Sequence, residues 1–343
     1  MSITMKKIAE GLNISRTCVS TVLNNRPQPH VAPETRRRIL ELANQYNYRP
    51  NRAAQLLCGK SARIIGVLRF GYELYRYATE YLTELLNNNN YSVYYANICT
   101  AERERKVIEE LIDKGADGFI LFHNRSRQKY DTYTKPEVVI SDYHENYDIT
   151  IDLELGGYMA TMHLLEHGHR DILTITPYVA PQESSGAASF SKYAGYRRAL
   201  EGKGLPVRPP LLVNNTVECA ELLLNQIRLK KVTALVCSND ELAGRAINFL
   251  AMNGINVPAD VAVTGFDHSK FADFFMPGLC TVAQPVMQAA ELATKILLEK
   301  LASNNLAVVD NPVILPTELI PNRSCGCPPC SLSPFDIYPK KTL

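Results

Sequence analysis

The chain has 343 residues, of which 46% are hydrophobic and 21% charged, and its formal net charge at pH 7 is +2. That composition is typical of a globular protein, and the length predicts two or three domains. No stretch approaches the roughly 18 apolar residues of a membrane span, and no secretion signal is visible at the N-terminus. The nine cysteines lie mostly isolated in apolar segments, which fits a reducing cytoplasm.

Positive charge is concentrated at one end of the chain. Residues 1–60 contain ten Lys or Arg and three Glu, which gives this segment a charge of +7 and leaves −5 for the rest. We therefore expect a polyanionic partner that binds the N-terminal end only. The alternative is a solvated basic surface without a partner.

The same basic segment predicts two short helices joined by a tight turn. An apolar stripe at helical spacing follows Thr4, a residue suited to cap the first helix, and consists of Met5, Ile8, Ala9 and Leu12. Asn13 falls where a left-handed turn is needed, and Ser15 can cap the second helix. On that helix Arg16, Thr17, Ser20 and Thr21 share one arc, and Cys18, Val19, Val22 and Leu23 share the other. This pattern indicates a helix-turn-helix.

A third helix and a linker follow. Pro33 and Glu34 suit a first helical turn, and the apolar stripe of this helix is Ile39, Leu42, Ala43 and Tyr46. Pro50 then ends one element, and residues 51–57 can form one more short helix before Gly59.

From Ile64 onward, short apolar runs alternate with amphipathic stretches. The runs read as buried parallel strands and lie at 64–68, 91–96, 118–122, 138–141, 171–175, 233–237 and 261–265. The predicted helices lie at 101–114, 155–166, 191–203, 240–253 and 286–302. Such alternation predicts a doubly wound α/β architecture, and about 260 residues suit two sheets better than one.

A series of sequence pieces resembles the lactose/galactose repressor family of bacterial transcription factors. The pieces occur in family order over roughly residues 4–324 and include IAEGLNIS, VSTVLNN, RAAQLLCGKSARIIGVL, YAGYRRAL, SNDELAGRAI, GINVPADVAVTGFD and LCTVAQP. The resemblance implies an all-α helix-turn-helix headpiece, a hinge helix, and an α/β core similar to periplasmic sugar-binding proteins, with two doubly wound parallel-sheet subdomains. It also implies a homodimer that reads a near-palindromic operator.

The resemblance implies the following division of the chain. The headpiece covers 1–48, the hinge helix 49–61 and the effector-binding core 62–324. Within the core, the N-subdomain takes 62–154 and 285–314, and the C-subdomain takes 155–284 and 315–324. The chain crosses between the subdomains near Asp152, Ala283–Gln284 and Leu315. We expect residues 325–343, rich in Pro and Ser, to form a mobile tail.

The family's DNA contacts map onto the headpiece and hinge. Arg16 and Thr17 hold the positions that read bases, and Arg suits guanine O6 and N7. Thr21, where most relatives have Arg, is expected to contact either a base or a phosphate. The other expected DNA-binding residues are Ser15, Ser20, Asn24, Arg36 and Asn51, of which Ser15, Asn24 and Arg36 are expected to hold the DNA backbone. Leu57 corresponds to the hinge residue that wedges between base pairs, the alternative being dimer packing.

Effector contacts are expected in the crevice at the carboxyl ends of the strands. Asp142, Asn239 and Asp267 each follow a predicted strand, and an Asn and a carboxylate can grip neighbouring sugar hydroxyls. For the two aspartates, capping of a strand end is the alternative. Lys192 replaces the family's usual Arg and offers a point charge in place of a planar fork. The chain has no Trp, so the candidate substitutes for a sugar-stacking platform are Tyr72, Tyr75, Tyr178 and Phe190, and a structural role is the preferred interpretation for each of them.

Two cysteine and histidine patterns have weak metal-binding character. His163 and His167 have a helical spacing that can hold a metal, although the family has a similar run for structural reasons. Cys325, Cys327 and Cys330 lack a fourth ligand, and an exposed, redox-labile tail is the preferred interpretation. We expect no metal and no cofactor. No catalytic constellation accompanies the α/β region, so we expect no enzyme.

These patterns favour a cytoplasmic, nucleoid-associated transcriptional regulator, and we expect it to be a repressor. Its partners would be double-stranded operator DNA, a carbohydrate effector and a second copy of the chain, without a membrane. The alternatives are a sugar-binding transport or chemosensory protein with the same core, and a sugar-processing enzyme. A secretion signal in place of the headpiece would favour the transport protein.

Overall fold

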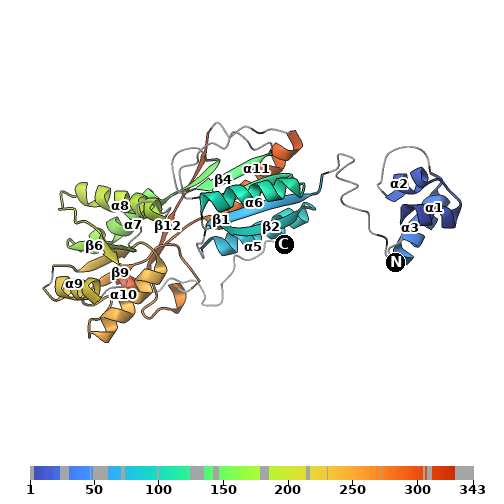
Figure 1. The fold of residues 1–343 in the computed structure, drawn as a ribbon. Helices are drawn as coiled ribbons and strands as arrows, with labels where there is room; N and C mark the ends of the chain where they lie inside the picture. The colour runs from blue at the N-terminus through green and yellow to red at the C-terminus, as the bar shows by residue number, and fades with distance from the viewer. Residues whose placement is uncertain are drawn as a thin grey trace. The chain divides into compact units, whose positions relative to one another are not determined.

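The protein divides into two compact units, residues 1–62 and residues 63–343 (Figure 1). The computed structural model describes residues 4–23, 31–46, 48, 61–70, 74–98, 100–123, 135–141, 147–177, 185–213, 217–229, 231–270, 272–303, 306 and 311–328. The first unit is the headpiece and the second is the core.

Three helices form the described part of the headpiece: α1 (Met5–Leu12), α2 (Arg16–Leu23) and α3 (Pro33–Gln45). Thr4 caps α1, with its Oγ1 accepting a hydrogen bond from the Lys7 backbone nitrogen at 3.4 Å. Asn13 takes the left-handed conformation (φ 52°) that the turn requires, and Ser15 Oγ caps α2 by accepting from the Cys18 nitrogen at 3.1 Å. These three sequence predictions are confirmed. Ala32 precedes α3 without a side-chain cap, as its methyl group requires.

A small apolar core holds the three helices together. It consists of Ile8, Ala9, Val19, Val22, Ile39 and Ala43. The arc assigned to the polar face of α2 is wrong in one respect: Thr21 is only 5% exposed. Helix α2 packs against both α1 and α3, so more of its surface is covered than a single apolar arc would bury.

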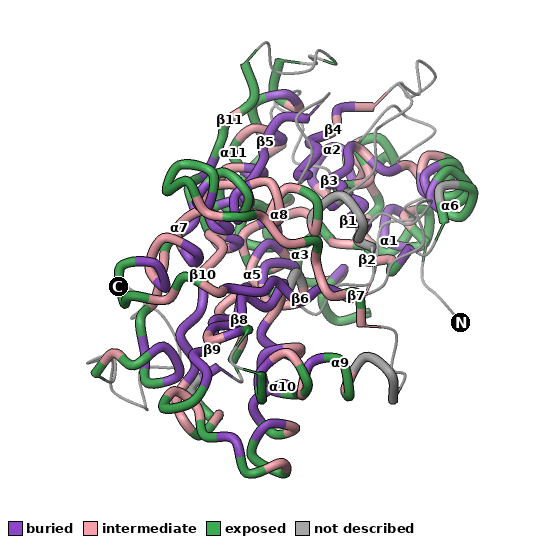
Figure 2. Tube along the Cα trace, turned by 90° about the vertical axis from the view of Figure 1, so that its left-hand side faces the viewer, coloured by how far each residue is buried: buried purple, intermediate pink, exposed green. Residues whose placement is uncertain are grey.

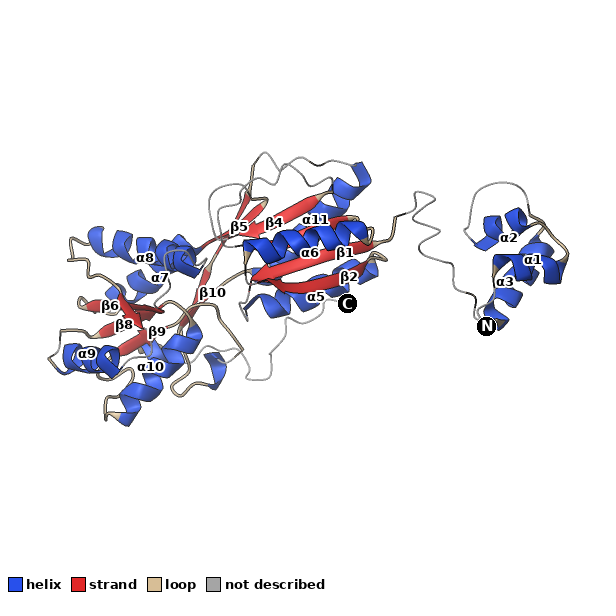
Figure 3. Cartoon of the chain, viewed as in Figure 1, coloured by secondary structure: helices blue, strands red, loops and turns tan. Residues whose placement is uncertain are grey.

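The larger sheet of the core has six parallel strands in the order β11-β5-β4-β3-β1-β2. Helices α5 and α11 pack with alternate strand residues on one face, and α6 packs on the other (Figure 3). The strands are β1 (Ile64–Phe70), β2 (Ser92–Ile98), β3 (Gly118–His123), β4 (Glu137–Ser141), β5 (Ile149–Asp152) and β11 (Val313–Pro316); the helices are α5 (Leu74–Asn88), α6 (Ala101–Asp113) and α11 (Val286–Ser303).

The smaller sheet has four parallel strands in the order β7-β6-β8-β9. Its buried residues pack with α7 and α8 in one cluster and with α9 and α10 in another, so both faces are covered. Figure 2 shows buried residues along β8 and β9. The strands are β6 (Ile172–Pro177), β7 (Leu211–Val213), β8 (Ala234–Cys237) and β9 (Ala262–Thr264); the helices are α7 (Leu153–Glu166), α8 (Ser185–Glu201), α9 (Val217–Arg228) and α10 (Asp240–Met252).

Three chain segments connect the two sheets. β5 of the larger sheet ends at Asp152, where α7 begins; β11 ends at Pro316 and is followed by β12 (Glu318–Ile320). β10 (Thr281–Ala283) pairs antiparallel with β12 and leads into α11. Two short 3-10 turns, η1 (Ala272–Phe274) and η2 (Arg323–Cys325), complete the described elements.

The expected parallel strands and the five expected helices are present in the core, with boundaries shifted by a few residues. Five short strands, β5, β7, β10, β11 and β12, have no counterpart among the expected ranges, because three or four residues are too few to show a periodicity, and the helices α5 and α9 are additional to the five expected. The expectation of a mobile tail from residue 325 is wrong for its first residue, since Cys325 ends η2 and is 2% exposed.

Candidate functional site

The first turn of α2 presents two polar side chains to solvent. Arg16 and Thr17 are both exposed, and Ser20 one turn later is half-buried. Ser15, at the start of the same helix, and Arg36, on the first turn of α3, are exposed as well. By contrast Arg37 is bound to Glu34 at 2.7 Å and to Glu41 at 3.2 Å. The side chains at the beginning of α2 are therefore accessible to a partner, whereas Thr21 is buried and has little accessible surface.

Four of the expected site residues, Asn24, Asn51, Leu57 and Asp142, lie outside the described residues. Their roles stay predictions.

In the core, two glycines bring α7 and α8 into backbone contact. A Cβ at Gly157 would lie 2.0 Å from the backbone oxygen of Lys192, and one at Gly195 would lie 2.0 Å from that of Glu154. Only glycine permits this approach. This close crossing of α7 and α8 fixes the position of Lys192 relative to the smaller sheet.

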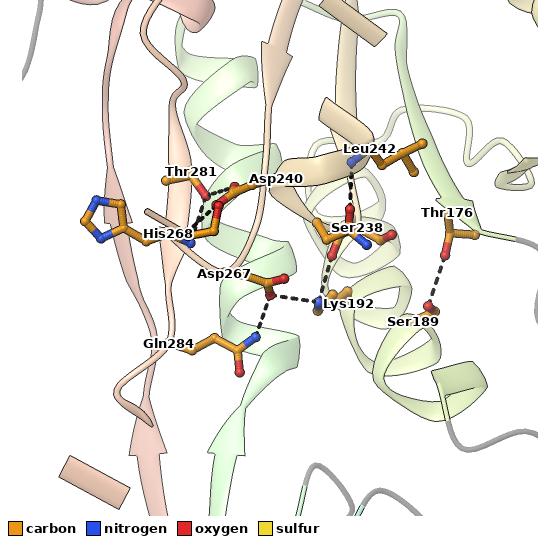
Figure 4. Close-up of polar contacts among 12 residues, drawn as sticks. Thr176, Ser189, Lys192, Ser238, Asp240, Leu242, Asp267, His268, Thr281 and Gln284 are labelled. Carbon is orange, nitrogen blue, oxygen red and sulfur yellow. Dashed lines mark hydrogen bonds and ion pairs between the residues drawn. The ribbon is translucent and has the colours of Figure 1, made fainter. Parts of the chain in front are cut away.

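Lys192 reaches from α8 to the carboxyl edge of that sheet (Figure 4). Its Nζ donates a hydrogen bond to the Ser238 backbone oxygen at 2.7 Å and lies 3.6 Å from Asp267 Oδ1. The ammonium also lies 4.0 Å from the centre of the Phe266 ring, a cation–π distance. Ser238 directly follows β8, and Asp267 follows β9 by two residues, so the ammonium joins two strand ends.

Asp267 occupies a backbone conformation that few residues with side chains adopt, with φ at 104°. Its nitrogen donates to the Val282 oxygen at 2.8 Å, which attaches it to β10 at the connection between the sheets. Gln284 Nε2 donates to its Oδ1 at 2.7 Å. Burial raises the pKa of Asp267, and the charge of Lys192 and the Gln284 hydrogen bond oppose that rise.

Two buried polar atoms beside this ion pair have no hydrogen-bond partner among the described residues. They are the hydroxyl oxygen of Ser238 and the Oε1 of Gln284. Buried polar atoms are paired in the great majority of cases, and an exception commonly marks a place where a ligand or water binds. The pair of Lys192 and Asp267 therefore lies between two atoms with free hydrogen-bonding capacity.

Asn239 and Asp240 follow Ser238 and begin α10. Asn239 Oδ1 accepts from the Leu242 nitrogen at 2.7 Å, so the oxygen expected to grip an effector caps a helix instead. Asp240 is 1% exposed and accepts hydrogen bonds from the Thr281 hydroxyl and the Ser269 nitrogen. Burial, followed by the charge of Asp267, raises the pKa of Asp240 to about 7.

A second polar pair lies at the end of β6. Thr176 Oγ1 donates to Ser189 Oγ of α8 at 3.0 Å (Figure 4). The next residue, Phe190, is 75% exposed. An exposed aromatic ring on the helix that carries Lys192 can stack on a ligand.

The structure thus brings together Lys192 and Asp267 of the expected effector residues, and it gives the side-chain oxygen of Asn239 a capping role. Sequence reasoning missed Gln284 and Ser238. Gln284 lay at a predicted crossing between subdomains, and Ser238 followed a predicted strand, so both carried a positional signal. The assembled groups are a cation, a carboxylate, an amide and a hydroxyl, which can hold a polar ligand by charge and hydrogen bonds.

An all-α headpiece joined to two parallel sheets with a polar cluster at their connection defines a DNA-binding regulator with an effector-binding core. The model for bacterial regulatory proteins of the lacI family matches residues 4–51, and that for a periplasmic binding protein-like domain matches residues 161–325. The HTH-type transcriptional repressor PurR of Vibrio parahaemolyticus is 30% identical over 322 residues, covering 87% of this chain and 92% of that protein.

This chain belongs to the LacI family and is a transcriptional regulator, not an enzyme. Its fold matches the Lac repressor dimer bound to operator and the anti-inducer ONPF (TM-score 0.80, 20% identity, 95% and 99% of the two chains). It also matches a complex of the transcriptional regulator CelR with cellobiose (TM-score 0.64, 23% identity, 94% and 99%). None of the described helices is long and apolar enough to cross a membrane.

Proposed function

We propose that this protein is a repressor that binds operator DNA as a homodimer in the cytoplasm and that a carbohydrate bound beside Lys192 and Asp267 controls the binding. The observation that carries the effector site is the partly exposed ion pair between them, flanked by the unpaired atoms of Ser238 and Gln284. The expected headpiece, hinge and subdomain boundaries belong to the same proposal.

The mixture of donors and acceptors favours a hydroxylated ligand. Each sugar hydroxyl donates one hydrogen bond and accepts others. The carboxylate of Asp267 and the Oε1 of Gln284 accept, the ammonium of Lys192 donates, and the Ser238 hydroxyl does both. The exposed ring of Phe190 supplies an apolar surface for a sugar face. The CelR complex with cellobiose has the same fold, so a core of this kind accommodates a sugar.

The connection between the two sheets provides a route by which ligand binding would alter DNA binding. Asp267 is attached to β10, and β10 leads through Gln284 and Pro285 into α11 of the larger sheet. A ligand that bridges Lys192 and Gln284 would favour one arrangement of the two sheets. It changes operator affinity only if it binds the two arrangements unequally.

Calorimetry with a panel of sugars, sugar phosphates, nucleobases and amino acids tests the effector class. We expect a sugar to bind tightest to the wild type and to lose at least about tenfold in affinity with Asp267→Ala, the equivalent of a hydrogen bond to a charged group. A nucleobase or amino acid as the tightest ligand would contradict the carbohydrate class. Equal binding by Asp267→Ala would contradict the site.

Selection of operator sequences from random DNA tests the headpiece. Because Arg16 is exposed at the start of α2, Arg16→Ala should cost about 1–3 kcal/mol on the selected site and relax one base position. Arg37→Ala is a matched control, since Arg37 is engaged by Glu34 and Glu41. An unchanged consensus for Arg16→Ala would show that Arg16 does not read a base.

A further inference from the structure

A cluster of histidine and cysteine side chains lies at the C-terminal end of α7, outside the residues proposed to bind DNA or the effector. His163 lies in the last turn of α7 and His167 caps that helix. Cys325 and Cys327 come from the segment after β12, about 160 residues later in the chain. The fold therefore joins an HxxxH pair to a CxC pair.

The distances between these side chains suit a single metal ion. Cys327 Sγ lies 3.3 Å from His167 Nε2 and 3.6 Å from His163 Nε2, and Cys325 Sγ lies 3.1 Å from His163 Nε2. Ligands on a tetrahedral Zn²⁺, with Zn–N near 2.0 Å and Zn–S near 2.3 Å, are roughly 3.3–3.8 Å apart. The separations that join Cys327 to the two histidines are close to that range, whereas the Cys325 thiol is near His163 but is not grouped with His167 or Cys327.

We propose that His163, His167 and Cys327 form a zinc-binding site that fastens the C-terminal segment to the end of α7. Their ligand atoms lie within 4.8 Å of one another, and two imidazole nitrogens with one thiolate are ligands that zinc accepts in tetrahedral sites. Cys325 belongs to a separate group with His163 and Cys280, and it becomes the fourth ligand only if its side chain turns toward the other three.

The local backbone holds the cysteines in place. Ser324, which is fully buried, donates to the Val263 oxygen at 2.6 Å and accepts from the Cys280 nitrogen at 2.8 Å. Gly326, between the two cysteines, has φ at 92°, a conformation that glycine adopts without strain. The turn at Gly326 lets both thiols face α7, so the ligands are positioned before a metal arrives.

The surroundings also favour a cation. The carbonyl end of a helix carries partial negative charge, and the site lies at that end of α7. His167 is exposed and Cys327 is half-buried, which leaves a path from solvent, whereas Cys325 is buried.

Metal analysis of the purified full-length protein, kept reduced, tests the site. We expect one Zn²⁺ per chain after dialysis, and on substitution with Co²⁺ the visible and near-ultraviolet bands of tetrahedral cobalt with a thiolate ligand. Zn²⁺ should also raise the melting temperature, because it binds the folded chain. Absence of zinc together with an octahedral cobalt spectrum would overturn the proposal.

Variants at the two more accessible ligands identify the residues. Cys327→Ser and His167→Gln should each weaken zinc binding, measured against a chromophoric chelator, by more than the roughly 10–100-fold typical of losing an outer-shell partner. His169→Gln is the matched control: it lies in the same turn, but its ring bonds Thr233 Oγ1 at 3.1 Å. Cys330→Ser is a second control and should retain the wild-type affinity.

His167 is exposed and Cys327 is half-buried, so circular dichroism should show the wild-type fold in both variants. Wild-type zinc affinity in folded Cys327→Ser or His167→Gln would overturn the assignment. An equal loss in His169→Gln or Cys330→Ser would do the same.

Discussion

Two Lys–Asp pairs among the described residues of the core differ in almost every physical respect. Lys300 Nζ lies 2.8 Å from Asp148 Oδ1 and donates a second hydrogen bond to the Glu137 oxygen at 2.8 Å. The other oxygen of Asp148 accepts from the Val139 nitrogen at 2.8 Å. The two side chains are 8% and 2% exposed. The pair is closed and ties α11 to β4 of the larger sheet.

The pair of Lys192 and Asp267 is longer, at 3.6 Å, and its side chains are 14% and 18% exposed. It adjoins two buried polar atoms without partners, whereas the charged groups of the first pair bond to backbone atoms of β4 and its neighbours. A closed pair stabilises a fold, and an open pair with unpaired neighbours keeps bonding capacity for a ligand. Both pairs consist of a lysine and an aspartate, so their geometry and surroundings, and not their residue types, distinguish a structural ion pair from a candidate binding site.

The largest expected effect comes from breaking the closed pair. Lys300→Met leaves the Asp148 carboxylate buried without its counter-ion, and it should lower the free energy of unfolding by about 3–5 kcal/mol. Urea denaturation measures the loss. Lys295→Met, on an exposed position of the same helix, is the control and should stay within about 0.5 kcal/mol of the wild type. Equal stability of both variants would contradict the structural role.

Lys192→Met should affect effector binding more than it affects the stability of the fold. Because the pair is longer, at 3.6 Å, and more exposed than the pair of Lys300 and Asp148, the free energy of unfolding should fall by less than it does in Lys300→Met. Effector binding should weaken by about 1.5–3 kcal/mol, the contribution of a hydrogen bond from a charged donor. Lys203→Met, at an exposed position after α8, should alter neither quantity. If Lys192→Met lost stability and kept its ligand affinity, Lys192 would have the structural role that we assign to Lys300.

A third prediction concerns pH. Since the pKa of Asp240 is raised from 3.8 to about 7, the folded state holds a proton that the unfolded state has released between those values. The free energy of unfolding should therefore decrease as the pH rises from about 4 to about 7. Asp240→Asn should flatten this dependence, which denaturation at several pH values will show. An unchanged profile in Asp240→Asn would assign the proton to another group.

The smallest expected effects come from substituting two buried serines, Ser238 and Ser324. Ser238→Ala removes an unpaired hydroxyl, so stability should hardly change, while ligand affinity should fall by about 0.5–1.5 kcal/mol. Ser324→Ala breaks two hydrogen bonds, to Val263 and from Cys280, and should lower the free energy of unfolding by about 1–3 kcal/mol. Thermal denaturation of both variants, with and without ligand, makes the comparison. Greater destabilisation by Ser238→Ala would mean that its hydroxyl is paired.

Sequence periodicity predicted the helix-turn-helix and most of the parallel strands, because long amphipathic patterns depend on local spacing. It misassigned Thr21, which was placed on the exposed arc of α2 but is 5% exposed in a helix that packs against both α1 and α3. Lys192 and Asp267 were predicted as site residues, and the structure brings them together.

The remaining parts of the site depend on contacts between distant segments, which no local pattern carries. Gln284 joins Asp267 only because β10 extends alongside the end of β9. The HxxxH and CxC patterns were each too weak to predict a metal site, and they meet only because η2 lies against α7. Asn239 was predicted to contact the effector, and in the structure its side-chain oxygen caps α10.

The most direct test of effector control is the operator affinity of the wild type and Lys192→Met, measured by fluorescence anisotropy with and without the tightest-binding sugar. Coupling between two sites is typically 5–150-fold, so the sugar should change the wild-type operator affinity by at least about fivefold. In Lys192→Met, at the same sugar concentration, the change should disappear while affinity for operator alone stays near that of the wild type. A sugar effect of equal size in both proteins, or none in the wild type, would contradict control through the Lys192–Asp267 site.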